Sequence, residues 1–196
     1  DSGEIQILNE TVSDQNSFLN PKYLKEKGLA HVPEDRQRMG LITDFKANEN
    51  LIFGYHHQSP FSKSSVLMEN EILSYSKKVM SDYDVRPQAP DLITSNFSGG
   101  NQQKIILSRE LNKNPKVLLV GQPTRGVDIG AIEFIHQRLI DMRDKGVAIL
   151  LVSVELEEVL SLSDRIIVMF DGKIVGEKTN QDVTDREIGL LMAGIS

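Results

Sequence analysis

The chain has 196 residues, which is enough for one ordinary domain, or for a core with an inserted subdomain, to bury a hydrophobic core. Its formal net charge of −6 argues against binding to nucleic acid or to anionic lipid, and the absence of cysteine excludes disulfides and cysteine-based metal sites. No apolar run approaches the roughly 20 residues that a membrane-spanning helix needs.

The first part of the chain predicts short elements. Gly3 to Leu8 alternate between polar and apolar residues, which predicts a strand. Lys22 to Lys27 predict a brief charged helix that ends at Gly28, because glycine accepts the left-handed conformation of a helix end. Leu29 to Val32 predict a core strand, and the charged turn 33–36 follows it.

Residues 37–97 have a different pattern. Ala47 to Phe53 predict a short helix, and Glu69 to Asp82 predict a longer one. The longer helix places three apolar residues on one face: Ile72, Tyr75 and Val79. The polar segment Tyr55 to Ser65 between the two helices predicts a loop.

No metal site is predicted. The neighbouring His56 and His57 should point apart, and no carboxylate is spaced to complete a ligand set, so they are interpreted as surface histidines of a loop. His31 and His136 are interpreted in the same way.

From Pro115 onward strands alternate with helices, which implies parallel strands with right-handed crossovers. Val117 to Val120 and Val147 to Val152 predict buried strands. The helix between them should end at Gly146. Its apolar face is expected to comprise Ile132, Ile135, Leu139 and Met142.

The last part of the chain predicts a short acidic helix, a strand hairpin and a final helix. Glu155 to Leu162 form the acidic helix, whose paired acids Glu157 and Glu158 are interpreted as a solvated face. Arg165 to Phe170 predict a strand that turns back at Asp171-Gly172 into a second one, Lys173 to Glu177. The final helix should run from a capping box at 184–187 to Met192.

A glycine-rich turn, Asn96 to Lys104, runs into the helical segment Ile105 to Leu111. Two adjacent glycines let backbone N–H groups approach a ligand, and the start of a helix adds unpaired N–H groups and a positive dipole end. Ser98 adds a hydroxyl, and Asn101 and Gln102 add amides. The segment therefore predicts a phosphate-binding tip, although Ser-Gly-Gly alone is equally well explained as a tight turn with a serine cap.

The order of the motifs is specific. Residues 98–104 are followed by Pro123 to Asp128, by Val152 to Leu156 and by 163–175. This arrangement resembles the ATP-binding subunits of ABC transporters, and in particular those that import simple sugars and nucleosides. In that resemblance 98–104 correspond to the signature loop, 123–128 to the D-loop and 152–156 to the switch segment.

The resemblance implies an α/β fold, a partial ABC-type P-loop ATPase domain with a mostly parallel sheet core and an inserted helical subdomain. Residues 1–36 would form the N-terminal part of the ATPase core, 37–113 the helical subdomain with the signature helix, and 114–196 the C-terminal part of the core. The residues from Gln122 to Gly126, with 132–136, favour the nucleoside branch.

Departures from the family pattern predict a degenerate catalytic site. The phosphate-cradling loop G-x-x-x-x-G-K-[ST] is not present, and in the family it lies upstream of the segment that begins at Gly3, so we expect a fragment of a C-terminal ATPase half. The aspartate and glutamate at the end of the apolar strand are replaced by Gly121 and Gln122, and the switch histidine by Val154. The fragment alone is therefore expected to be inactive, with no protein ligands for a metal.

The resemblance implies a role in another half's ATP site. Ser98, Gly99 and Gly100 would contact ATP held by a second ATPase half, which also supplies the Mg²⁺ ligands, and Asn101 and Gln102 would lie nearby.

Asp128 would brace the interface between the halves. Glu34 and the segment 37–97 would transmit closure to transmembrane permease subunits, and indirectly to a solute-binding protein, at the cytoplasmic face of a bacterial membrane. The alternatives are an interaction module that binds no nucleotide, and a soluble ABC ATPase of DNA repair or translation, which the lack of heptads and of positive charge disfavours.

Overall fold

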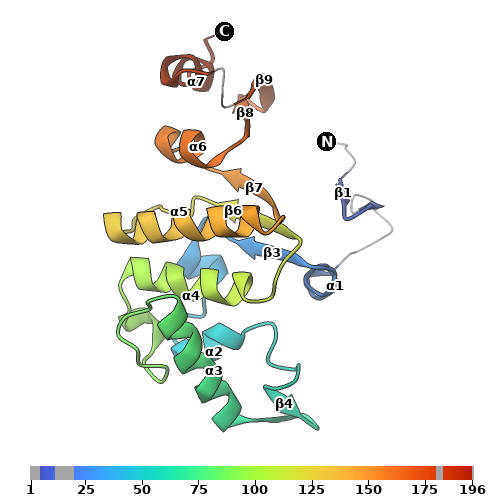
Figure 1. Cartoon of the computed structure of the whole chain (residues 1–196), viewed down its shortest axis with the longest axis vertical. Helices are drawn as coiled ribbons and strands as arrows, with labels where there is room; N and C mark the ends of the chain where they lie inside the picture. Colours follow the sequence, from blue (N-terminus) through green and yellow to red (C-terminus); the bar gives the residue numbers. More distant parts are fainter. Residues whose placement is uncertain (1–4, 12–19, 180–182, 196) are drawn as a thin grey trace.

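The computed structural model describes residues 5–11, 20–179 and 183–195. At its centre lies a parallel sheet of three strands, β3 (Leu29–Val32), β6 (Val117–Gly121) and β7 (Ala148–Val152), in the order β3-β6-β7. Leu29 pairs with Val117, and Val117 pairs with Ala148. Figure 1 shows this sheet between the helices of the middle segment and the C-terminal elements. The predicted core strands and their parallel arrangement are confirmed.

The N-terminal elements are only partly as predicted. α1 (Pro21–Lys27) begins after the cap residue Asn20 and ends at Gly28, whose φ of 105° is left-handed. The predicted strand from Gly3 to Leu8 is confirmed at β1 (Gln6–Ile7), but it ends earlier than expected, because the chain turns back at Leu8 into β2 (Glu10–Thr11). Gly3 and Glu4 lie outside the described residues.

The segment between β3 and β6 contains the short turns η1 (Arg36–Gly40) and η2 (Thr94–Asn96), with α2 (Ala47–Ile52), α3 (Glu69–Asp82) and α4 (Gly99–Leu111). The helices α2 and α3 confirm the predictions. The predicted loop 55–65 is wrong at its end, because β4 (Ser62–Lys63) pairs antiparallel with β5 (Val66–Leu67). The helix expected from Ile105 already begins at Gly99, because Ser98 caps it there.

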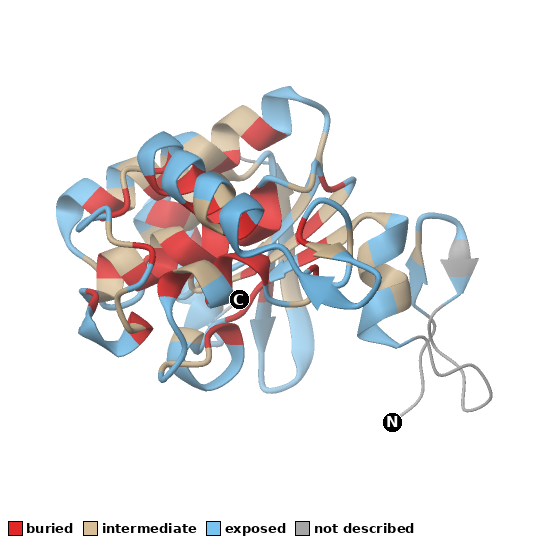
Figure 2. Ribbon diagram, turned by 90° about the horizontal axis from the view of Figure 1, so that it is seen from below, coloured by how far each residue is buried: buried red, intermediate tan, exposed pale blue. Residues whose placement is uncertain are grey.

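Helix α4 is the centre of the hydrophobic core. Its residues Ile105, Ile106 and Leu107 are fully buried, and they belong to one cluster with Leu118 of β6 and Ile135 of α5 (Ile129–Asp144). Figure 2 shows the buried residues gathered where these helices meet. Burying each such side chain contributes roughly 1.5–3 kcal/mol, so this packing fixes where the first turn of α4 points.

Strand β7 differs from the prediction of a fully buried strand. Ile149 and Leu151 pack against the core, whereas Leu150 is 59% exposed and Val152 60% exposed. Alternate residues of a strand point to opposite faces, so β7 packs one face against the core and leaves the other face uncovered.

The helix before β7 shifts its buried face by one position at its start. α5 buries Ala131, Ile135, Leu139 and Met142, whereas Ile132, which was expected on this face, is half-buried. Gly146 follows the helix with a left-handed φ of 87°, as predicted.

The C-terminal elements are α6 (Leu156–Leu162), β8 (Arg165–Phe170), β9 (Lys173–Thr179) and α7 (Asp185–Met192). The predicted hairpin is confirmed: β8 and β9 are antiparallel, and Asp171 and Gly172 turn between them with positive φ. The expected parallel pairing does not extend to β8, which among the described residues pairs only with β9. The capping box at Thr184 and Glu187 opens α7 as predicted.

The acidic pair of α6 corrects a prediction. Glu158 is only 3% exposed, and its Oε1 lies 3.1 Å from Nε2 of His136 on α5. Glu158 therefore does not belong to a solvated surface, because α6 packs this position against α5, whereas Glu157 is exposed as predicted. In the described ranges, no helix has both the length and the apolar character needed to cross a bilayer.

Candidate site at the start of helix α4

The start of α4 is a polar tip whose cap Ser98 is exposed, whereas Gly99 is half-buried and Gly100 is buried. Ser98, just before the helix, has extended backbone angles, and its Oγ accepts hydrogen bonds from the side-chain amide of Asn101 (2.8 Å) and from the backbone N–H of Asn101 (3.5 Å). Asn101 also accepts a 2.6 Å bond from the N–H of Arg86. Ser98 is therefore a helix cap, and the N–H groups of Gly99 and Gly100 lie in the first turn, where a helix provides no acceptor.

Packing within the chain leaves little room for a side chain at either glycine, and least at Gly99. A Cβ on Gly99 would lie 2.6 Å from the guanidinium of Arg36 and 2.9 Å from the carbonyl oxygen of Gly126. A Cβ on Gly100 would lie 3.0 Å from Oδ2 of Asp128 and from Cβ of Ala131. The tip and the loop 123–128 are thus in direct contact, and any side chain at Gly99 would displace one of them.

Gln102 points away from the tip. It is buried, and its Nε2 donates to the carbonyl oxygens of Thr94 and Phe97, both at 3.2 Å. Its Oε1 lies 3.4 Å from Nε2 of Gln37. The side chain supports the backbone below the tip from inside.

The loop 123–128 joins the end of β6 to α5. Asp128 caps α5, since its Oδ1 accepts from the N–H of Ala131 at 2.9 Å. The two internal backbone bonds of the loop are long, at 3.2 Å from Arg125 to Gln122 and 3.3 Å from Val127 to Thr124. Arg36 adds two bonds from outside, to the carbonyl oxygens of Arg125 (2.6 Å) and Gly126 (3.2 Å).

Gly121 at the end of β6 and Gln122 after it carry no acidic group. Gly121 lies against Glu34, whose backbone nitrogen would be 3.2 Å from a Cβ at 121. Gln122 has a positive φ of 45°, and its Oε1 accepts a weak 3.4 Å bond from the N–H of Val154. The Val154 side chain is exposed and apolar. An amide can orient a water molecule but cannot take its proton at neutral pH.

Glu34 lies at the same corner as the end of β6. Its Oε1 is 3.1 Å from the guanidinium of Arg125, and both side chains are more than half exposed. Such an exposed ion pair contributes little to stability, at most about 1 kcal/mol. It links the turn 33–36 to the loop 123–128.

A charged group fixes the loop that precedes the tip. Lys104 of α4 donates to the backbone oxygen (3.0 Å) and the carboxylate (3.3 Å) of Asp84. The hydrogen bond from Arg86, followed by the one from Lys104, holds the pKa of Asp84 below its ordinary value of 3.8. The loop that bonds to Asn101 is thereby tied to the side of the same helix.

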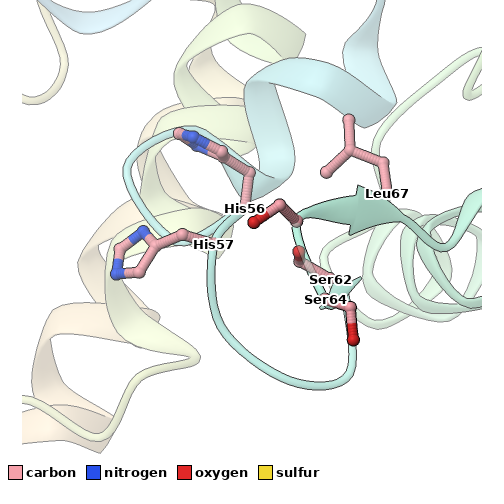
Figure 3. Close-up of a pocket in the computed structure, with 6 residues that line it drawn as sticks. His56, His57, Ser62, Ser64 and Leu67 are labelled. Carbon is pink, nitrogen blue, oxygen red and sulfur yellow. The ribbon is translucent and has the colours of Figure 1, made fainter.

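The two histidines at 56 and 57 lie away from this tip, beside the β4–β5 hairpin. Figure 3 shows them over a shallow hollow with Ser62, Ser64 and Leu67. Their rings make an edge contact with centroids 5.7 Å apart, so the expectation that they point apart is wrong, because the chain turns there instead of forming a helix or strand. No group of three potential metal ligands exists in the part of the chain that the structure describes.

Comparison with solved structures identifies the fold. A dimeric ATP-binding cassette in a post-hydrolysis state, bound to ADP and Pi, superposes with a TM-score of 0.72 at 23% identity, covering 91% of this chain and 74% of that chain. A nucleotide-free cassette from an ABC transporter gives a TM-score of 0.70 at 24% identity, covering 91% and 70%. The chain has an ATP-binding cassette fold. It comprises the parallel sheet core and the helical insertion of that fold, as predicted.

The cassette is also similar in sequence to import ATP-binding proteins. It is 44% identical over 99% of its length to the guanosine import ATP-binding protein NupO of Bacillus subtilis, and 44% identical over 99% to the nucleoside import ATP-binding protein NupA of Lactococcus lactis. A ribose import ATP-binding protein, RbsA of Streptococcus agalactiae, is 34% identical over 98% of the chain. The chain spans 37% of NupO and 38% of NupA and RbsA. No family model matches it.

Sequence reasoning missed one residue of the site, Arg36. It was included only as part of a charged turn, yet its side chain bridges the tip and the loop 123–128. The local sequence carries no signal for this role, because Arg38 lies in the same turn and is of the same residue type. The partners lie about 90 residues away and cannot be read from the local sequence.

Proposed function

We propose that this cassette is the degenerate, C-terminal ATPase half of an importer for nucleosides or simple sugars, and that it completes the ATP site of a second half. Ser98 and the N–H groups of Gly99 and Gly100 contact the γ-phosphate of ATP bound to that half, which also supplies the Mg²⁺ ligands. Asn101 holds Ser98 in place, and Gln102 supports the turn from inside. ATP hydrolysis in the whole protein then drives solute import.

One observation carries this proposal: the two ends of the site differ in what they offer a nucleotide. The start of α4 offers a hydroxyl, two N–H groups without helical acceptors and a positive dipole end. The end of β6 offers Gly121, Gln122 and the nearby Val154, none of which can bind Mg²⁺ as a carboxylate or accept a proton from water. We propose that a tip of this chemistry binds phosphate, while the residues at 121, 122 and 154 supply no group for hydrolysis.

The remaining parts have roles in coupling. We propose that Asp128 braces the interface between the halves, and that Glu34 and the segment 37–97 transmit closure to permease subunits at the cytoplasmic face of the membrane. Residues 1–36 and 114–196 are the two parts of the ATPase core. The relatives named for guanosine, nucleoside and ribose import support a small polar solute, which a separate binding protein would deliver.

A second candidate function is an interaction module that binds no nucleotide. The intrachain packing of Gly99 and Gly100 favours it, because this packing explains both glycines without any ligand. An informative experiment must therefore change the phosphate contact without disturbing that packing.

Ser98 allows such an experiment in the full-length protein. Aspartate and asparagine are both good helix caps, so Ser98→Asp and Ser98→Asn should keep the cap and the stability of α4. Only the aspartate adds a negative charge where the γ-phosphate would lie. We expect Ser98→Asp to lower ATPase activity by about a hundredfold, the effect of losing a preorganised phosphate or oxyanion contact, and Ser98→Asn to lower it far less.

Both variants should unfold at the wild-type temperature, which shows that the cap is retained. Wild-type ATPase activity in Ser98→Asp would contradict the proposal and favour the interaction module.

A further inference from the structure

Arg36 occupies a central place between three segments of the chain. It follows β3, in the turn that begins at Pro33. A Cβ built on Gly99 would lie 2.6 Å from its guanidinium, and the guanidinium donates hydrogen bonds to the loop 123–128. Its side chain is thus in contact with the first turn of α4 and with the loop 123–128, which leads from β6 to α5.

The chemistry of the contact is specific to arginine. The two terminal nitrogens of the guanidinium donate to two successive carbonyl oxygens, Arg125 at 2.6 Å and Gly126 at 3.2 Å. The planar fork of a guanidinium presents its donors in fixed directions, whereas a lysine ammonium is a single point charge. The positive φ of Gly126, 65°, lets the backbone turn so that both carbonyls face Arg36.

The loop depends on this contact because its own bonds are weak. The two backbone hydrogen bonds inside 122–127 are at the long end of the range for N–H···O bonds. The ion pair between Arg125 and Glu34 is exposed to solvent. Arg36 is therefore the only described side chain that holds two backbone carbonyls of this loop from outside.

We infer that Arg36 is a positioning residue that holds the loop 123–128 in a fixed position relative to the first turn of α4. The inference rests on the proposed function, since register matters for activity only if the tip completes an ATP site. Arg36 acts through the loop and touches no reacting atom. Misplacement of a catalytic surface by about 1 Å can cost up to a hundredfold in rate, so a modest shift of the loop is sufficient.

Arg36→Met tests the inference in the full-length protein, with Arg38→Met as the matched control. Arg38 lies in the same turn and is exposed, and the structure gives its guanidinium no hydrogen bond to any described residue. We expect Arg36→Met to lower kcat for ATP hydrolysis by about tenfold with KM for ATP unchanged, because orientation is lost and not ground-state binding. Arg36→Lys should give an intermediate kcat, and Arg38→Met the wild-type value.

Hydrogen exchange provides a readout that does not depend on ATPase activity. The N–H groups of Arg125 and Val127 should exchange faster in Arg36→Met than in wild type, and at the wild-type rate in Arg38→Met. Equal behaviour of the two methionine variants in both measurements would overturn the inference, as would faster exchange without any loss of kcat.

Failure of the proposed function has a different signature. It would appear as wild-type ATPase activity in Ser98→Asp, independently of the results for Arg36→Met.

Discussion

The two ends of helix α4 are constructed in opposite ways. The start exposes its cap Ser98 and is made of glycines and small polar residues, whereas the last turns bury an ion pair. There Glu110, only 1% exposed, accepts from Arg109 at 2.8 Å and from Lys25 of α1 at 3.2 Å. The difference shows how one helix combines an accessible hydroxyl at its start with a fixed orientation: the buried end anchors the helix, and the glycines pack the first turn against Arg36 and the loop 123–128.

This comparison predicts that the buried end is the more sensitive. Glu110→Ala should lower the free energy of unfolding by about 3–5 kcal/mol, because it leaves Arg109 buried without its counter-charge. Chemical denaturation measures the loss. The double variant Arg109→Met/Glu110→Leu should recover most of it, since replacing a buried pair with apolar groups is often neutral. If Glu110→Ala cost no more than Ser98→Asn at the other end, the contrast between the ends would be wrong.

Asn50 of α2 holds two segments that lie beside the start of α4, at Ile42 and at Thr94. It is fully buried and binds both backbone groups of Ile42, at 2.9 and 2.8 Å, and the hydroxyl of Thr94, at 2.9 Å. Asn50→Ala should destabilise the fold by about 2–4 kcal/mol, because the buried hydroxyl of Thr94 and both backbone groups of the half-buried Ile42 lose a bond.

A matched control for this prediction lies on the same helix. Asn48→Ala removes a bond to Asp91 that is exposed to solvent, and it should change thermal unfolding little. Equal losses in the two variants would show that the loops below the tip are not held by Asn50.

The smallest expected effect concerns pH and Asp84. Its pKa in the folded protein lies below 3.8, so the pair with Arg86 and Lys104 adds stability above that pH and loses it as pH falls through the lowered pKa. Because the carboxylate is exposed, the contribution is about 0.2–1 kcal/mol. Unfolding temperatures between roughly pH 2 and 6 should therefore fall less steeply in Asp84→Asn than in wild type.

Asp44→Asn is the control for this pH dependence, since the structure records no ion pair for Asp44 with any described residue. A slope in Asp84→Asn equal to that of the control would show that the loop 84–86 is not held by charge.

Local sequence patterns predicted most of the elements. Helix α3, the left-handed glycines after α1 and α5 and the capping box of α7 follow from spacing and residue type alone. The order of the motifs predicted the cassette fold, which the solved structures confirm. These features depend on residues that are close together in the sequence, or on a pattern specific to one fold.

The failures have a common cause in long-range packing. The burial of Glu158 depends on His136, 22 positions away on another helix. The exposure of Leu150 depends on which elements cover the sheet, which alternation within β7 cannot show. Gln102 was expected near a ligand because of its place in the motif, but carbonyls at 94 and 97 turn it inward. Whether the tip binds phosphate stays a prediction.

The close approach of Gly121 to Glu34 has a consequence for how the site can change. A Cβ at 121 would lie 3.2 Å from the backbone nitrogen of Glu34, so a side chain fits there only after the turn at 33–36 moves by a few tenths of an ångström. That turn also carries Arg36, and therefore the register of the loop 123–128. We therefore expect substitutions at 121 and in the turn 33–36 to be non-additive in their effect on stability, because they act on the same backbone segment.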